Sequence, residues 1–164
     1  GTIHVNTNGS LTKELERLIA AGIDSVRISI NSFRETWYQA YFRPKDYAFS
    51  DVMSSIGLSL EKGLYVSINY LNMPGLTDTP EELESLLSFL KKYPIHRIQW
   101  RNMNFDPLRY HEAMSRAASC GKALGVPFLL KRIQKSFPGL SFGYFNPPRE
   151  TWGVIKNLKP KAEA

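Results

Sequence analysis

The chain has 164 residues, of which 43% are hydrophobic and 22% charged, and its formal net charge at pH 7 is +6. This is enough apolar material for one hydrophobic core, but a complete (β/α)8 barrel takes about 250 residues. No apolar run approaches the roughly 18 residues of a membrane span, and a single cysteine excludes an internal disulfide. The composition therefore indicates one domain of a cytoplasmic protein without a membrane partner.

Four segments alternate apolar and polar residues and have asparagine at or near their carboxyl ends: residues 3–9, 26–31, 66–72 and 98–104. Because successive side chains on a strand point to opposite faces, each segment predicts a strand with one apolar and one polar face. The apolar face carries Val5, Ile28, Ile30, Val66, Ile68, Ile98 and Trp100. The polar face carries His4, Asn6, Arg27, Ser29, Asn31, Ser67, Asn69, Gln99 and Arg101. Such a face either contacts solvent or binds a ligand.

Helical patterns separate these strands. Apolar residues at helical spacing occur in residues 11–19 and 52–60, and each pattern ends at a glycine before the next strand. Alternating strands and helices predict βα repeats and a parallel sheet. Since the strands are too polar for a sheet covered on both faces, a curved sheet with helices only on its outside fits better, as in a barrel or part of one. Ligands are then expected at the carboxyl ends of the strands.

Capping residues predict where other helices begin. Ser32 with Glu35, and Thr79 with Glu82, have the spacing of capping boxes. A later helix is expected to run from Asp106 to near Gly125, another over residues 128–137, and a last strand over residues 140–145.

The strand tips also contain short motifs in a fixed order. They are Asn6-Thr7-Asn8-Gly9, then Asp24 to Asn31, then Val66 to Asn69 followed by Pro74-Gly75-Leu76-Thr77-Asp78, then Ile98 to Asn102. Over residues 3–106 this order resembles the second half of a radical S-adenosylmethionine (SAM) domain. The resemblance implies an α/β fold in which parallel βα repeats form part of an open (β/α)6, TIM-like barrel, with helices on the outer face.

Enzymes of that family are oxidoreductases that cleave SAM reductively at a [4Fe-4S] cluster and generate a 5'-deoxyadenosyl radical. Cys120 is the only thiol here, whereas a cluster normally needs three or four. The resemblance therefore implies a carboxyl-terminal fragment whose four strands correspond to the third through sixth of the barrel. Its partner would be the missing amino-terminal part of the same polypeptide, which holds the cluster. The chain alone is expected to be inactive.

The resemblance also places part of the SAM cleft on the polar face. The expected cofactor contacts are Asn8, Arg27, Ser29, Asn31, Asn69, Gln99, Arg101 and Asn102. Hydroxyl, amide and guanidinium groups suit a ribose and a carboxylate. For Asn8, capping of its own loop is an equal alternative. No catalytic residue and no metal ligand is expected in this chain.

Aromatic and cationic residues are dense between Phe33 and Phe49. They indicate either a lid over the barrel mouth or helix packing, and packing is favoured for Trp37 and Tyr41. Arg43 is expected to contact the substrate, because Pro44 should fix its loop.

Residues 1–155 are expected to form one domain, with the barrel elements in 3–106 and an extension in 107–155, followed by a disordered tail over 156–164. The net charge of +6 supports an alternative function, in which a basic α/β domain binds RNA or a small phosphate or sugar ligand without catalysis. The charges are scattered along the sequence, however, so they also fit a solvated surface.

Overall fold

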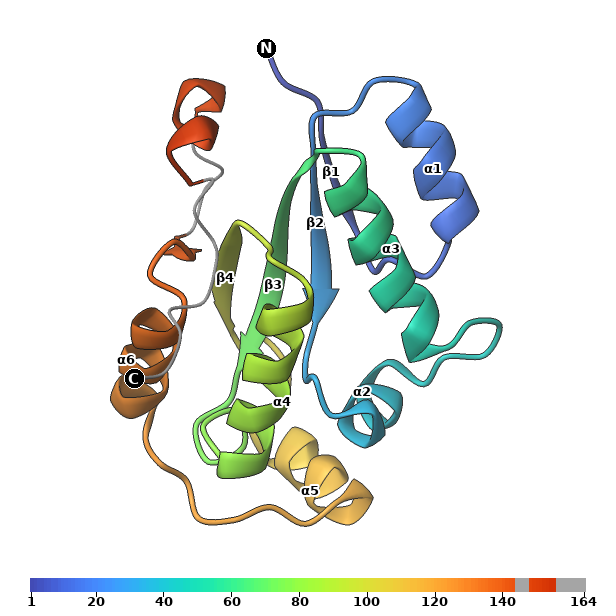
Figure 1. Cartoon of the computed structure of the whole chain (residues 1–164). Helices are drawn as coiled ribbons and strands as arrows, with labels where there is room; N and C mark the ends of the chain where they lie inside the picture. The colour runs from blue at the N-terminus through green and yellow to red at the C-terminus, as the bar shows by residue number, and fades with distance from the viewer. Residues whose placement is uncertain (144–147, 156–164) are drawn as a thin grey trace.

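The computed structural model describes residues 1–143 and 148–155. Its parallel strands form one five-stranded sheet in the order β1-β2-β3-β4-β5 (Figure 1). The strands are β1 (His4–Thr7), β2 (Ser25–Ile30), β3 (Tyr65–Asn72), β4 (Arg97–Asn102) and β5 (Ser141–Phe142). Each strand pairs in parallel with the next one along the chain, so the predicted βα repeats are confirmed.

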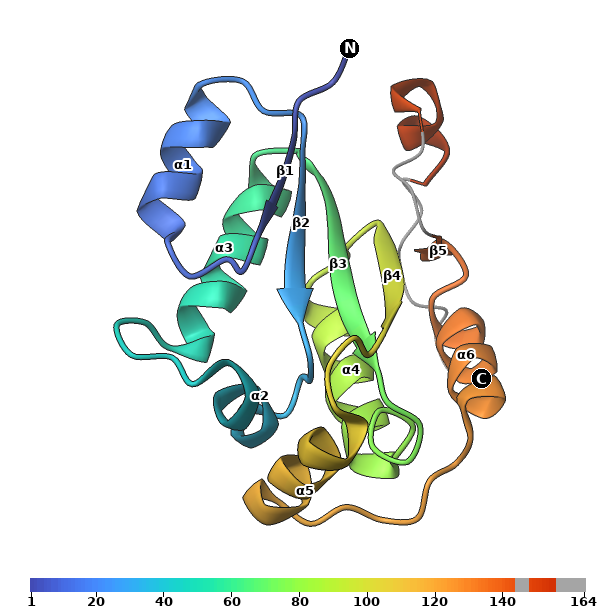
Figure 2. The same cartoon turned by 180° about the vertical axis from the view of Figure 1, so that it is seen from behind.

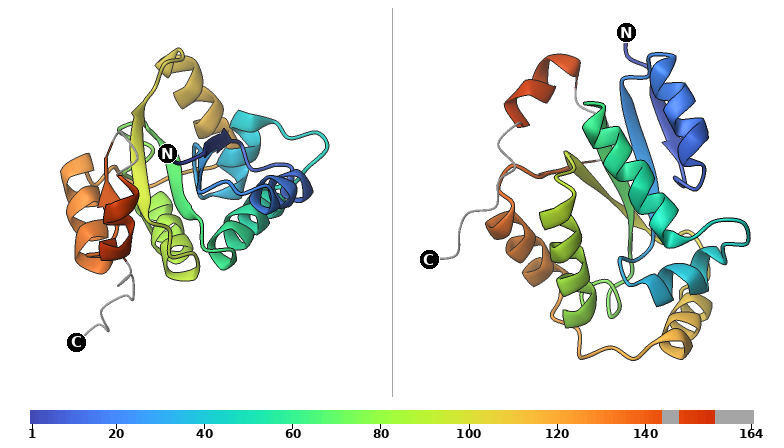
Figure 3. Two further views of the ribbon diagram at one scale, coloured as in Figure 1. Left: turned by 90° about the horizontal axis from the view of Figure 1, so that it is seen from above. Right: turned by 45° about the vertical axis from the view of Figure 1, so that its right-hand side comes forward.

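The helices divide between one face of the sheet and its carboxyl end. The bounds are α1 (Thr12–Ala20), α2 (Glu35–Phe42), α3 (Phe49–Glu61), α4 (Pro80–Lys92), α5 (Pro107–Ala117), α6 (Val126–Ser136) and the 3-10 helix η1 (Arg149–Ile155). Helices α1, α3, α4 and α6 lie along the outer face (Figure 3), while α2 and α5 lie beyond the strand tips. Seen from behind, none of the helices in the described ranges lies in front of the strands (Figure 2). The other face of the sheet is therefore open.

The core lies between the sheet and the outer helices. Ile28, Ile68 and Ile98 are paired across neighbouring strands, and all three are fully buried. They belong to one cluster with leucines of the outer helices, such as Leu15 and Leu86. Full burial of each such side chain stabilises the fold by roughly 1.5–3 kcal/mol. The apolar face that the alternating pattern predicted is therefore the face that packs against the outer helices.

The prediction of two capping boxes is wrong, although the helices that they were expected to begin, α2 and α4, are present. The N-cap of α2 is Arg34 rather than Ser32. Thr79 is the N-cap of α4, as predicted, but its side chain donates to the carbonyl of Leu76 at 2.8 Å instead of capping the helix. Glu82 turns away from the helix start because it is buried against the sheet, where three other donors bind it.

Helix α5 ends at Ala117, well before the predicted end near Gly125. The backbone N–H of Gly121 donates to both carboxylate oxygens of Glu81 at 2.9 Å, and that of Leu124 to the carbonyl of Asp78 at 2.8 Å. These bonds hold the segment extended along the start of α4, so the helix does not continue.

The last predicted strand is confirmed only as the short β5, and residues 144–147 lie outside the described ranges, as does the predicted tail over 156–164. Within the residues that the structure describes, no helix is both long and apolar enough to span a membrane.

Candidate functional site

Polar side chains form rows across the open face of the sheet. The strand register aligns Ser29, Asn69 and Gln99, which we call the amide row. Two residues nearer the amino ends, it aligns Arg27, Ser67 and Arg97, which we call the guanidinium row. Because neighbouring strands lie about 4.8 Å apart, the members of one row can contact a single small ligand.

The amide row has hydrogen-bonding capacity that the protein does not use. Gln99 is only 3% exposed and Asn69 is partly buried. The side-chain oxygens Asn69 Oδ1 and Gln99 Oε1 are buried, and within the described residues neither has a hydrogen-bond donor. A buried acceptor without a donor costs about 1–3 kcal/mol, so native proteins usually satisfy it with water or a ligand. These oxygens can accept from an amino group or a hydroxyl of a bound molecule.

The guanidinium row makes the open face positive. Arg27 Nε donates to Ser67 Oγ at 3.4 Å, and Arg97 Nε donates to Ser141 Oγ at 3.0 Å. Burial lowers the pKa of Arg27, as do the nearby charges of Arg101 and Arg97. None of the five strands contains an aspartate or a glutamate. Guanidinium groups of this kind can bind a carboxylate.

Two predicted contact residues have hydrogen-bond partners within the protein, although Asn31 Oδ1, like the oxygens of the amide row, is buried without a donor among the described residues. Asn31 is 3% exposed, and its amide donates to the carbonyl of Trp37 at 3.1 Å and to the hydroxyl of Tyr110 at 3.3 Å. It thereby ties α2 to α5. Asn8 Oδ1 accepts from the backbone N–H of Ser10 at 3.1 Å and from its hydroxyl at 2.8 Å, which is the loop-capping arrangement.

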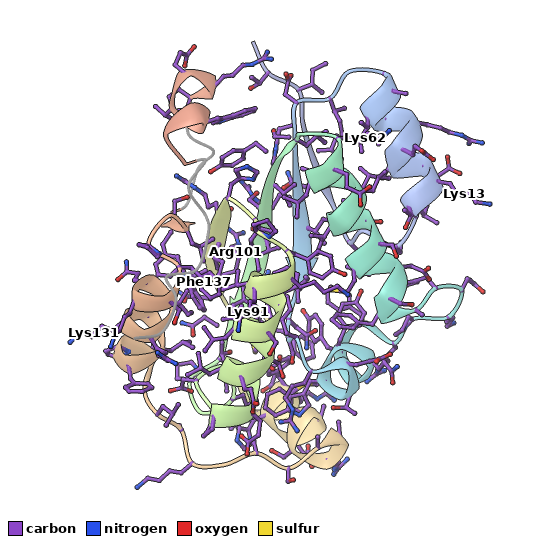
Figure 4. The ribbon with its side chains drawn as sticks, viewed as in Figure 1. Lys13, Lys62, Lys91, Arg101, Lys131 and Phe137 are labelled. Carbon is purple, nitrogen blue, oxygen red and sulfur yellow. The ribbon has the colours of Figure 1, made fainter. Side chains whose placement is uncertain are left out.

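The remaining predicted contacts lie at the end of β4. Arg101 (Figure 4) is exposed, and by the alternation of strand side chains it shares a face with Gln99, whereas Asn102 points to the opposite face. The structure thus brings together Arg27, Ser29, Asn69, Gln99 and Arg101. It does not bring Asn8, Asn31 or Asn102 to the amide row.

A cavity of about 690 Å³ lies between α2 and α5, and its lining includes Arg43. Opposite Arg43 the lining comes from Phe105 and from α5 residues such as Arg109 and Arg116. Sequence reasoning missed these α5 residues, because they lie more than 60 positions after Arg43. The density of aromatic and cationic residues between Phe33 and Phe49 predicted only the side of this cavity that α2 and Arg43 form, and not the side formed by α5.

The described residues do not fit an iron–sulfur cluster. Cys120 is a half-buried free thiol, and over residues 1–143 and 148–155 no three His, Cys, Asp or Glu side chains gather in a way that could hold a metal ion. A [4Fe-4S] cluster is normally held by cysteine thiolates. The amide row, by contrast, fits the amino group and hydroxyls of a nucleoside, because it offers acceptors that have no donor among the described residues.

Solved structures of low sequence identity share this fold. A radical SAM methyltransferase from Sphaerobacter thermophilus has 17% identity and a TM-score of 0.60, over 88% of this chain and 41% of that one. SuiB from Streptococcus suis has 14% identity and a TM-score of 0.56, over 88% and 33%. Coproporphyrinogen III oxidase (HemN) from Escherichia coli, described as a radical SAM enzyme, has 16% identity and a TM-score of 0.54, over 81% and 30%.

The chain therefore spans less than half the length of each of these three proteins. A search of curated proteins by sequence gives no match. The family model described as the radical SAM superfamily matches residues 1–90, which is more than half of the chain. The parallel sheet, its outer helices and this match lead to one conclusion: the chain belongs to the radical SAM superfamily.

Proposed function

We propose that this chain is the carboxyl-terminal part of a radical SAM enzyme and that it forms one wall of the SAM and substrate clefts. The observation that carries the proposal is the amide row, in which the buried oxygens of Asn69 and Gln99 face the open side of the sheet without donors among the described residues. The family match over residues 1–90 supports SAM as the ligand of this face.

Each part of the open face has a role in binding SAM. The oxygens of Asn69 and Gln99 accept hydrogen bonds from the adenine amino group or from ribose hydroxyls, and the hydroxyl of Ser29 adds a donor beside them. Arg27 and Arg101 attract the carboxylate of the methionine moiety. The chain therefore orients the cofactor and excludes water from one of its sides.

The full-length protein, in this proposal, carries a [4Fe-4S] cluster on residues outside this chain. When bound, such a cluster would supply the electron for reductive cleavage of SAM to methionine and a 5'-deoxyadenosyl radical, while the residues of this chain would hold and orient SAM. With Cys120 as its only thiol, this chain alone gives no turnover. Arg43 is the proposed substrate contact on this side of the cleft.

Calorimetric titration of SAM into the protein tests the amide row. We expect Asn69→Ala and Ser29→Ala each to weaken SAM binding roughly tenfold, since a lost hydrogen bond of about 1.4 kcal/mol changes Kd by that factor. Ser54→Ala on α3 and Gln134→Ala on α6 are matched controls, because both residues are exposed on outer helices. SAM binding that is unchanged in Asn69→Ala and Ser29→Ala would contradict the proposal.

A further inference from the structure

We propose that the groove between α2 and α5 binds the substrate through a carboxylate attached to a flat, apolar group. The α2–α5 groove is the cavity of about 690 Å³ lined by Ala40, Tyr41, Arg43, Phe105, Arg109, Tyr110, Glu112, Ala113, Met114 and Arg116. Its volume is typical of sites for small organic ligands. This inference rests on the proposed function, because α2 and α5, which line the groove, lie beyond the carboxyl ends of the strands (Figure 1), where barrel enzymes bind their substrates.

The charges in the groove favour an anion. Arg116 forms an ion pair with Glu112 at 2.6 Å, which neutralises both. Arg43 and Arg109 also line the groove, and in the part of the chain that the structure describes no ion pair involves either of them. Two exposed guanidinium groups thus line a cavity whose acidic lining residue, Glu112, is already paired with Arg116. Arginine binds a carboxylate, as it binds a phosphate, through two parallel hydrogen bonds, so a carboxylate fits this pair of guanidinium groups.

The apolar part of the lining favours a flat group beside that carboxylate. Phe105 is 53% exposed and Tyr41 is 38% exposed, although both have large aromatic rings. Tyr41 makes an edge-to-face contact with Tyr110 at a ring-centroid distance of 5.5 Å. A planar ligand would cover aromatic surface that now contacts water and could also stack against it.

The floor of the groove is fixed before any ligand binds. Trp37 Nε1 donates to the carbonyl of Met114 at 2.9 Å, and the Asn31 amide joins Trp37 to Tyr110. Trp37, Tyr110 and Met114 are all at most 4% exposed. These buried contacts hold α2 and α5 together, so binding does not have to order the site.

The backbone at Arg43 points to a role for its side chain. Arg43 is the C-cap of α2 with φ = 48°, and it is the one non-glycine residue with positive φ in the described ranges. Glycine is favoured at such a position, because other residues are strained there. An arginine in this conformation indicates that the guanidinium serves a purpose that outweighs the strain.

Calorimetric titration with 2-naphthoate, and with its uncharged counterpart 2-naphthamide, tests the groove. We expect naphthoate to bind more tightly than naphthamide, and Arg43→Gly and Arg109→Met each to weaken naphthoate binding at least tenfold. Arg43→Gly should leave the protein as stable as before or more stable, because glycine relieves the backbone strain. Lys131→Met is the control, since it removes the same charge from α6, far from the groove (Figure 4).

The groove proposal is overturned if Arg43→Gly and Arg109→Met bind naphthoate as tightly as the unchanged protein, or if naphthamide binds equally well. Titration of SAM into the same variants separates this outcome from a failure of the SAM proposal. The arginine variants should keep their SAM affinity, and Asn69→Ala should keep its naphthoate affinity. If the arginine variants lose SAM affinity but keep naphthoate affinity, the groove is wrongly assigned. If Asn69→Ala loses naphthoate affinity but keeps SAM affinity, the SAM site is wrongly assigned.

Discussion

Glu82 is a buried carboxylate that joins three parts of the fold. It is 1% exposed and accepts hydrogen bonds from the hydroxyls of Ser32 and Tyr70, both at 2.5 Å, and from the backbone N–H of Phe33 at 2.8 Å. Burial raises the pKa of Glu82, and although these hydrogen bonds favour the ionised form, burial has the larger effect. The carboxylate therefore fixes the β2–α2 loop at the cost of desolvating a charge.

We predict that Glu82 makes the protein less stable as the pH rises. The carboxyl pKa is raised in the folded state, so the folded state holds the proton more tightly than the unfolded one. The favourable contribution is complete below the unfolded pKa, near 4.3, and is lost as the pH rises through the raised folded pKa. In Glu82→Gln the free energy of unfolding should depend less on pH over this window, as measured by urea unfolding.

An equal pH dependence in Glu82→Gln would contradict this prediction. Glu82→Ala serves as the companion variant, because it removes the acceptor altogether. It leaves the Tyr70 hydroxyl and the Phe33 N–H without their partner, so we expect a loss of about 3 kcal/mol in the free energy of unfolding.

The face on which each strand residue lies could be predicted from the sequence, but the hydrogen-bond partners of buried side chains could not. Ser29, Asn69 and Gln99 were placed on one face because strand side chains alternate strictly. Their shared row follows once the strands are parallel and in register. Glu82 was assigned to a capping box, and the partners of Asn31 on α2 and α5 were not predicted, since local spacing carries no information about the tertiary donors and acceptors that surround each side chain.

Among the helical elements, α1 depends on the turn that precedes it. Gly9 in this turn has φ = 74°, and a Cβ atom at this position would lie 3.2 Å from both Ile28 Cγ2 and Val52 Cγ1. The Gly9 carbonyl accepts a hydrogen bond from Ser55 Oγ at 2.7 Å. The turn is thus packed between β2 and α3, and it has little room to move.

We predict that Gly9→Ala lowers the free energy of unfolding by about 2 kcal/mol, through backbone strain and overpacking together. Gly22→Ala is the matched control, because Gly22 also has positive φ (94°) but a Cβ there meets nothing within 4 Å. Strain alone should make that loss about 1 kcal/mol. Urea unfolding of both variants measures the difference, and equal losses would show that packing at Gly9 has no effect.

The order of the elements was predictable, but some of their ends were not. Strands and helices alternate as the apolar periodicity predicted, because that periodicity reflects which face packs on the core. The early end of α5 depends on Glu81 and Asp78, which lie about 40 residues before the segment they bind. The α2–α5 groove likewise needs two helices far apart in sequence, so only Arg43 was found from the sequence.

At the scale of the whole molecule, the formal net charge is +6, and cationic residues lie in several separate places. One is the open face of the sheet, where Arg27, Arg97 and Arg101 act on one another and no strand residue is acidic. Other cationic residues lie on the outer helices, where acidic residues offset them on every helix except α6. Lys13 and Lys131, for example, extend from opposite sides of the molecule (Figure 4). Scattered charges of this kind do not form the continuous basic stripe that would track a nucleic-acid backbone.

We therefore predict that ionic strength affects SAM binding weakly. SAM carries one carboxylate and so displaces few counterions, whereas a protein that neutralises 6–10 phosphates loses about 10³–10⁵ in affinity between 50 and 200 mM salt. Over this range SAM affinity should change by less than about threefold. A single-stranded RNA oligonucleotide titrated in parallel should bind only weakly. Tight RNA binding with a steep salt dependence, together with no measurable SAM binding, would favour the RNA-binding alternative over the cofactor cleft.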